Sequence, residues 1–305
     1  MNSVPAQSRS AEAFALLALV IAAAFSSTNL IVARMVVDFA PPLAMAFGRW
    51  FAVALVLLPF CYREVWTYRR AILREWPDLL ALSLTGMSLI AVGPFFAART
   101  TNAANMGLIF TFAPIAIVLC TRLFSREHMS AVQIAGILLG FLGVVTIVSH
   151  GDPDVILGLQ FVAGDLWMLL AASGWVVYSL LLKGRPSVLP DGVRLFVCAL
   201  GGSLLVLPLA IGEAIIVAPP PLDWRIITAV LFVALVPSFL AYRLHAYTTV
   251  KLGTGRTAVF SYLAPLFGVF FAWLILNEPV RGHHWIGGAA ILSGVWLTSR
   301  PKKQA

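Results

Sequence analysis

The chain has 305 residues, of which 60% are hydrophobic and only 11% are charged. Soluble domains carry about 25% charged residues, so this composition excludes an ordinary soluble protein and indicates an integral membrane protein. The net charge is +8. Basic residues in the loops of a membrane protein set its topology, and we therefore expect a lipid bilayer, and no nucleic acid, as the partner.

Long uncharged runs recur along the whole chain. A helix needs roughly 20 residues to cross the hydrocarbon core, and its backbone amides must be hydrogen-bonded within the segment. The runs therefore predict an all-α membrane protein. The ten predicted helices span about 13–36, 42–62, 79–98, 101–121, 131–149, 165–182, 193–212, 225–247, 255–277 and 284–299.

Two stretches of the chain repeat each other with an offset of 151 residues. Pro114 lies 13 residues before Glu127, and Pro265 lies 13 residues before Glu278. In each copy, two glycines follow the Glu by 9 and 16 residues, namely Gly136 and Gly143, then Gly287 and Gly294. The predicted organisation is a tail (1–12), a first five-helix repeat (13–150), an extracytoplasmic linker (151–164), a second repeat (165–300) and a basic tail (301–305).

The distribution of Lys and Arg predicts the topology. If the N-terminus is cytoplasmic, the inner segments carry 14 Lys and Arg and the outer links carry four. This bias predicts that both termini are cytoplasmic. Because each repeat has five helices, the second enters the membrane from the opposite side, and the repeats are inverted. Inverted repeats are typical of transporters that expose a midplane site to either side in turn.

Two five-helix halves, each with Ala-Pro, thirteen residues to Glu and then a Gly-rich helix, resemble the EamA-type members of the drug/metabolite transporter superfamily. The resemblance covers roughly residues 13–300 and implies ten helices and alternating access in the cytoplasmic (cell inner) membrane. It also implies that helices 1, 3, 4, 6, 8 and 9 line the cavity, with helices 5 and 10 at the periphery. The family often has Trp in the first helix of both halves; here Trp175 fits the second half, but Ser26 stands opposite it.

Arg49 lies inside the second predicted helix, about seven residues past Pro42. An Arg at mid-membrane costs roughly 3 kcal/mol or more unless it is paired or hydrated. Two interpretations stay open: contact with a substrate carboxylate or a gate, and a structural tie to carbonyls at a helix end.

Further polar residues inside the helices are candidates for substrate binding. Asn29 needs a partner in lipid, either in the cavity or between helices. Tyr242 and His245 are three apart and share one side of their helix, which allows both to face the cavity. Near a helix end, His245 could instead be an interfacial anchor.

Two pairs that each include an aromatic residue complete the candidate binding set. Trp175 and Tyr178 are three apart in the sixth predicted helix and could stack on an apolar or aromatic substrate. Ser261 and Tyr262 lie a turn before Pro265 and are placed similarly. Packing in the core or against lipid is the alternative for both pairs.

Prolines interrupt four of the predicted helices. Proline frees a carbonyl and bends a helix, so these positions are predicted hinges: Pro94, Pro114, Pro237 and Pro265. Glu127 and Glu278 sit at helix junctions, where a carboxylate interacts favourably with the first turn of the next helix. We expect a structural role for both.

The middles of the predicted helices carry no Asp or Glu. Proton-coupled transporters commonly use an intramembrane carboxylate, so we expect facilitated diffusion, exchange or coupling through His245. The chain has no GxxxxGK[ST] phosphate loop and no cluster with metal-ligand spacing. No cofactor, metal or enzymatic activity is expected.

The predicted function is secondary transport of a small amphipathic metabolite, an amino acid or related compound, with export as the predicted direction and a monomer as the predicted state. Alternating access itself runs in either direction. The alternatives are an uptake carrier for a vitamin or nucleoside-like solute, and a membrane scaffold or membrane-embedded enzyme.

Overall fold

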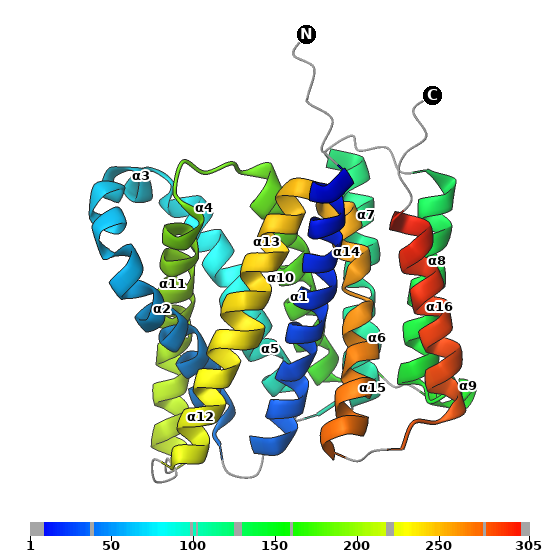
Figure 1. The fold of residues 1–305 in the computed structure, drawn as a ribbon. Helices are drawn as coiled ribbons and strands as arrows, with labels where there is room; N and C mark the ends of the chain where they lie inside the picture. Colours follow the sequence, from blue (N-terminus) through cyan, green and yellow to red (C-terminus); the bar gives the residue numbers. More distant parts are fainter. Residues whose placement is uncertain are drawn as a thin grey trace.

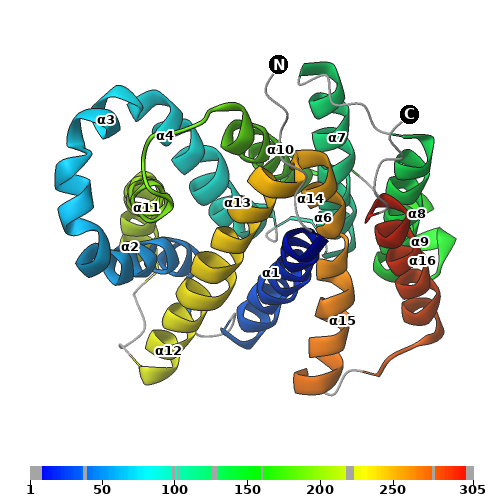
Figure 2. The same ribbon diagram turned by 45° about the horizontal axis from the view of Figure 1, so that its top comes forward.

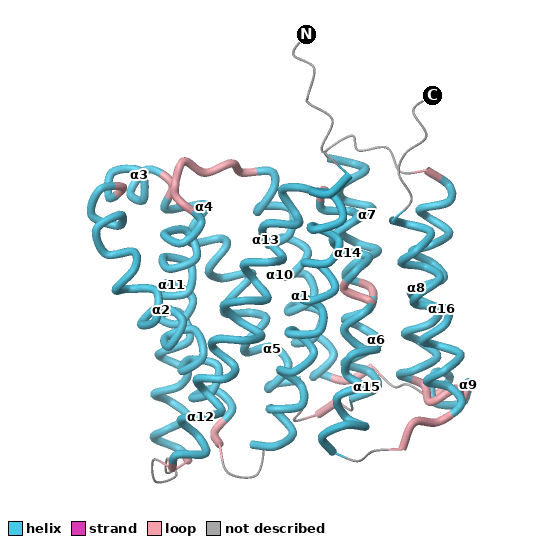
Figure 3. The backbone as a smooth tube through the Cα atoms, viewed as in Figure 1, coloured by secondary structure: helices cyan, strands magenta, loops and turns pink. Residues whose placement is uncertain are grey.

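The computed structural model describes residues 9–36, 40–97, 100–101, 103–124, 130–158, 161–217, 223–276 and 279–299. The regular elements over these residues are all helices (Figure 3). In the first half they are α1 (Arg9–Val36), α2 (Pro42–Thr67), α3 (Arg69–Arg74), α4 (Trp76–Leu82), the π-helix η1 (Ser83–Leu89), α5 (Ile90–Ala97), α6 (Ala103–Thr111), α7 (Ala113–Phe124) and α8 (Ala131–Val148).

A short helix in the predicted linker, α9 (Pro153–Leu157), precedes the second half. The elements that follow are α10 (Ala163–Gly184), α11 (Asp191–Ile216), α12 (Trp224–Val233), the π-helix η2 (Ala234–Leu240), α13 (Ala241–Leu252), α14 (Thr254–Phe260), α15 (Leu263–Leu276) and α16 (Gly282–Ser299).

These elements form an all-helical membrane protein of two inverted five-helix halves. Eight helical stretches in the described part of the chain are long and apolar enough to span a membrane. The interrupted helix α6–α7 and the helix α16 are the remaining two of the ten. The first turn of α1 and the last turn of α16 lie on the same side of the bundle (Figure 1), as an even number of crossings requires.

Helices from the two halves pair at both edges of the bundle. At one edge α2 packs along α11, and at the other α8 packs along α16 (Figures 1 and 2). Between these edges, α1 packs on α13 and α15, and α10 packs on α5 and α7. The inner group therefore combines the first, third, fourth, sixth, eighth and ninth helices of the chain, as the family resemblance implies.

The edge formed by α8 and α16 depends on glycines that bring the two backbones together. A Cβ on Gly136 would lie 2.6 Å from the carbonyl oxygen of Gly294, and a Cβ on Gly143 would lie 2.6 Å from that of Gly287. Small residues allow such close helix packing in membranes. The repeat offset relates Gly136 to Gly287 and Gly143 to Gly294, so the two contacts are symmetric.

The inner helices are irregular at equivalent places in the two halves. The π-helices η1 and η2 begin at Ser83 and Ala234 and end at Leu89 and Leu240. Both ends are separated by 151 residues, the offset found in the sequence. A π-helical turn has i→i+5 bonds, and such turns are frequent at functional sites.

A carboxylate ties the ends of the first edge pair together. Glu213, near the end of α11, accepts hydrogen bonds from the backbone N–H groups of Leu43 (2.8 Å) and Ala44 (3.0 Å) in the first turn of α2. Both N–H groups lack intrahelical partners, and the carboxylate also interacts favourably with the positive end of the helix dipole. Glu213 therefore fixes where α2 begins.

Candidate functional site

Four aromatic rings and one imidazole meet between α2, α10 and α13. Trp175 lies 5.4 Å from Tyr178 and 4.8 Å from His245, measured between ring centroids. Trp50 packs edge-on against Tyr242 at 4.8 Å, and Tyr242 lies 5.7 Å from Trp175 and from Tyr178. We refer to these five side chains as the aromatic cluster. Trp175 is its half-buried member, and the other four are buried.

The backbone of the π-helix η1 anchors the cluster. The Tyr242 hydroxyl donates to the carbonyl of Gly86 at 2.7 Å, and the Trp50 indole N–H donates to the carbonyl of Met87 at 3.1 Å. A Cβ on Gly86 would collide with the ring of Tyr178. The glycine therefore allows the ring from α10 to lie directly on η1, and three helices are tied to the irregular turn.

Arg49 lies at the edge of the cluster and is 8% exposed. Its Nη1 donates to the Oδ1 of Asn29 on α1 at 3.4 Å, and its Cζ lies 5.0 Å from the ring centroid of Trp50. Its Nε has no hydrogen-bond partner, and no carboxylate of the described residues pairs with the guanidinium. The structure thus holds a buried cation with an amide and a ring as its neighbours.

His245 is buried in the cluster and is not exposed at a helix end. Its ring lies over Trp175 and 6.5 Å from Tyr178, while its Nε2 makes no hydrogen bond to the described part of the protein. A buried polar atom is costly to leave unpaired. The imidazole, within the cluster, and Arg49, at its edge, are therefore two polar groups with unused hydrogen-bonding capacity.

The other predicted pair is Ser261 and Tyr262, and Tyr262 packs in a different part of the core from the cluster. Ser261 is half-buried at the break between α14 and α15, where Ala264 N–H bonds to its carbonyl at 3.1 Å. Tyr262 is buried, and its hydroxyl donates to the carbonyl of Thr111 at 3.2 Å, at the break between α6 and α7. Tyr262 and Thr111 are equivalent positions of the two repeats, so this contact links the two broken helices.

The predicted hinges all lie at or near irregular places in the inner helices. Pro94 is inside α5 and Pro237 is inside η2. Pro114 and Pro265 are the second and third residues of α7 and α15, just after the two breaks. Their role in movement stays a prediction. Glu127 and Glu278 lie outside the described residues.

Three residues of this site escaped the sequence analysis: Trp50, Gly86 and Met87. Gly86 and Met87 contribute backbone carbonyls, which any residue type supplies. The sequence did contain a signal for Gly86. It lies 151 residues before Pro237, so the two residues hold equivalent places in the third and eighth helices, and both residue types disturb a regular α-helix. Trp50 directly follows Arg49, which is a charged residue inside an apolar helix. This position was the one sequence feature that pointed to Trp50 as a site residue.

Comparisons with known proteins agree with this architecture. Residues 13–149 and 162–300 match the EamA-like transporter family. An uncharacterized transporter of Archaeoglobus fulgidus is 26% identical over 86% of this chain and 89% of its own length. The uncharacterized transporter YetK of Bacillus subtilis is 26% identical over 95% of this chain and 88% of its own length.

A solved crystal structure shares the fold, with a TM-score of 0.74, 21% identity and coverage of 93% of this chain and 97% of the other. Both halves match the family model, and the inverted five-helix arrangement is the one expected of it. The chain therefore belongs to the EamA-like transporter family and is a multi-pass membrane transporter of a small molecule, not an enzyme.

Proposed function

We propose that this transporter carries a small amphipathic metabolite with a carboxylate group, an amino acid or a related compound, by alternating access. The observation that carries this proposal is Arg49, a buried cation without a counter-charge beside the aromatic cluster. A buried charge requires several kcal/mol of compensation from a partner. A substrate carboxylate would supply it, with the free Nε as one donor.

The cluster offers a matching surface for the rest of the substrate. Trp175 is half-buried, so its ring has area left for contact. Aromatic faces bind apolar groups and cations, and the Nε2 of His245 adds a polar contact. A zwitterionic or polar head with an apolar part fits this combination better than a multiply charged solute.

Alternating access is supported by the irregular inner helices. Four of them carry a π-helix or a break, and these features recur at equivalent places in the two halves. On the side where α1 begins, Glu12 and Arg256 form an ion pair of 2.8 Å that joins α1 to α14. We expect this pair to separate when the site opens to that side.

Four buried hydroxyls without a hydrogen-bond partner lie in the inner helices of the described chain: Thr121, Ser179, Thr249 and Thr257. They belong to α7, α10, α13 and α14, which pack on one another. Uncharged hydroxyls suit the passage of a polar solute, because each can both donate and accept a hydrogen bond. We assign them to the path between the cluster and the end of the bundle where α1 begins.

The bias of Lys and Arg supports a cytoplasmic location for this end and for both termini. Export from the cytoplasm is the proposed direction. In the described part of the chain, the middles of the membrane helices contain no Asp or Glu. This favours transport that is not coupled to the protonation of a carboxylate.

The test is uptake into proteoliposomes of labelled amino acids and of the matching amides, which lack the carboxylate. In Arg49→Gln, flux of the acids should fall, while flux of the amides should persist. A charge-assisted hydrogen bond contributes about 1.5–3 kcal/mol, so the preference for acid over amide should fall roughly 10- to 100-fold. Arg243→Gln, which removes an exposed Arg of α13, is the charge-matched control.

Equal loss of acid and amide flux in Arg49→Gln would assign the Arg a structural role. A second pair of variants locates the apolar contact: Trp175→Ala should raise KM, and Trp285→Ala, which removes an exposed Trp of α16, should not. Saturable flux of vitamins or nucleosides, with none for amino acids, would contradict the proposed substrate class.

A further inference from the structure

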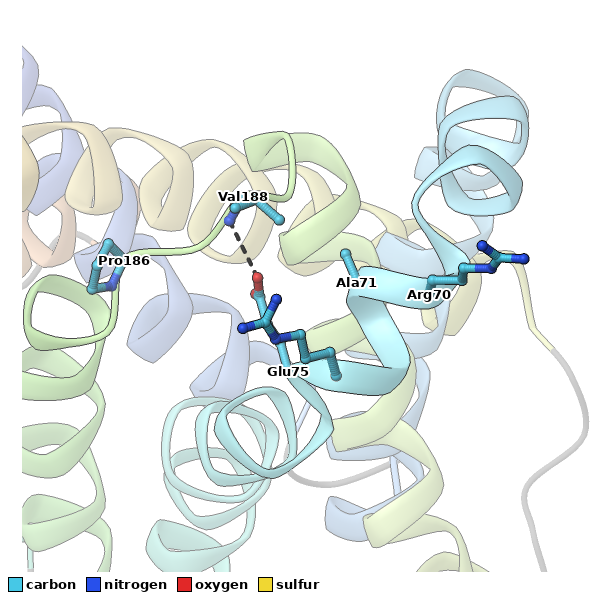
Figure 4. Close-up of a pocket in the computed structure, with 6 residues that line it drawn as sticks. Arg70, Ala71, Glu75, Pro186 and Val188 are labelled. Carbon is cyan, nitrogen blue, oxygen red and sulfur yellow. Dashed lines mark hydrogen bonds between the residues drawn. The ribbon is translucent and has the colours of Figure 1, made fainter.

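A pocket outside the aromatic cluster lies at the end of the bundle where α1 begins (Figure 1). It has a volume of about 460 Å³, within the roughly 300–1,000 Å³ of ligand pockets. It is formed by the short helix α3 and by the loop between α10 and α11 (Figure 4). The lining residues are Arg70, Ala71, Arg74, Glu75, Pro186 and Val188.

The single acid of the pocket is already engaged by the protein. The Glu75 carboxylate accepts hydrogen bonds from the Ser187 hydroxyl and from the backbone N–H of Val188, the latter at 3.2 Å (Figure 4). Both donors come from the loop, so this carboxylate holds the loop against α3. Each of its two oxygens thus already accepts one hydrogen bond from the protein.

The two arginines of the pocket, in contrast, are exposed and have no hydrogen-bond or ion-pair partner in the described structure. Other arginines nearby are engaged: the Nε of Arg63 donates to the Tyr62 hydroxyl, and Nη1 of Arg69 donates to the Trp66 carbonyl, both at 2.8 Å. Arg70 and Arg74 thus give the rim of the pocket a net positive charge and unused donors, and the Arg70 side chain points away from the loop (Figure 4). Guanidinium groups of this kind bind phosphate oxygens through paired N–H groups.

Apolar side chains around the pocket place it at the membrane surface. Trp66 and Leu73 are each 72% exposed, and Trp76 is 59% exposed. Exposed Trp residues at helix ends mark the level of the lipid headgroups. Val188, on the rim, is also exposed. The pocket therefore combines cationic donors with an apolar surround at the depth where phospholipid phosphates lie.

We propose that this pocket binds the phosphate headgroup of an anionic phospholipid, with Arg74 and, once its exposed side chain turns toward the loop, Arg70 as its ligands and the acyl chains along the apolar residues of α3 and its neighbours. Basic pockets between membrane helices recognise anionic headgroups in this way. A bound lipid would join α3 to the loop that Glu75 already holds. The proposal is independent of which solute the aromatic cluster carries.

The test is native mass spectrometry of the purified, delipidated protein titrated with phosphatidylglycerol, with phosphatidylcholine as the zwitterionic comparison. In the double variant Arg70→Gln/Arg74→Gln, phosphatidylglycerol should bind about tenfold or more weakly, because each basic residue adds appreciably to anionic-lipid affinity. The double variant Arg63→Gln/Arg69→Gln removes the same charge outside the pocket. It should retain at least most of the affinity.

Equal loss in both double variants would show general surface attraction and overturn the pocket. Unchanged binding in both would also overturn it. Glycerol phosphate, a soluble compound with the same phosphate chemistry, is the third arm: if it competes at concentrations similar to phosphatidylglycerol, the pocket takes a free phosphate and not a lipid. Far-UV circular dichroism of each variant establishes that the protein under test is folded.

Discussion

Replacing Gly143 with Ala should destabilise the protein by forcing α8 and α16 apart. The added Cβ would lie 2.6 Å from the carbonyl oxygen of Gly287 and 2.8 Å from the amide nitrogen of Ile291. Both are backbone atoms, and both separations are below 3.0 Å, which real Cβ atoms essentially never show. No side-chain rotation relieves the clash, so the two helices must separate.

The magnitude follows from the cost of overpacking, about 1–3 kcal/mol for a well-packed interior. Ala otherwise stabilises a helix by about 1 kcal/mol relative to Gly, which reduces the net loss. Gly287→Ala places its Cβ 2.6 Å from the carbonyl oxygen of Gly143, at the same crossing. Once one substitution has separated the helices, the second costs less, so the double variant should lose less than the sum of the two single losses.

The assay is SDS-induced unfolding of the purified protein in mixed micelles, followed by far-UV circular dichroism. Gly268→Ala is the matched control, because a Cβ at this position of α15 meets nothing within 4 Å; it should be neutral or stabilising. A Gly143→Ala protein as stable as Gly268→Ala would refute the close contact. Strict additivity in the double variant would refute the shared crossing.

Substitutions at three further positions have defined outcomes. Gly86→Ala should reduce solute flux strongly and change the unfolding midpoint little, since its Cβ displaces the Tyr178 ring. Flux and unfolding are measured on one preparation, and a loss of flux matched by a large drop in the midpoint contradicts this prediction. Glu213→Ala should cost about 0.5–2 kcal/mol in the unfolding assay, because the first turn of α2 loses its acceptor, whereas Glu213→Gln should cost less. Tyr262→Phe should cost about 1–3 kcal/mol, because the Thr111 carbonyl loses its buried donor; an unchanged midpoint would mean that water replaces the hydroxyl.

The membrane fold was predictable because lipid imposes strict rules on the chain. Long apolar runs must be helices, and the repeat spacing from Pro114 to Glu127 and from Pro265 to Glu278 predicts two equivalent halves. The 151-residue offset also relates the two π-helices. Helix ends were less predictable: the predicted second helix ends at residue 62, whereas α2 continues to Thr67, because polar residues at the membrane surface remain helical.

The candidate site was predictable only in part. Asn29, Arg49, Trp175, Tyr178, Tyr242 and His245 all stood out as polar or aromatic groups inside apolar helices, and the structure brings these six together. Ser261 and Tyr262 stood out equally, but Tyr262 packs in a different part of the core. In lipid, the outer face of a helix is as apolar as its packed face, so composition alone does not tell which way a side chain points.

Gly86 and Pro237 occupy equivalent positions of the two halves but differ in residue type. Differences of this kind would allow the chain to distinguish the two ends of a solute. Two separate copies of one five-helix unit would be identical at every equivalent position, and a site between them would receive the same side chains from both halves. Fusion into one chain releases this constraint. Here the second half supplies Trp175, Tyr178, Tyr242 and His245, and the first supplies Arg49, Trp50 and the Gly86 carbonyl. Under the proposed function, this symmetric scaffold presents a chemically polar axis, along which a molecule with an ionic head and an apolar tail would have one preferred orientation.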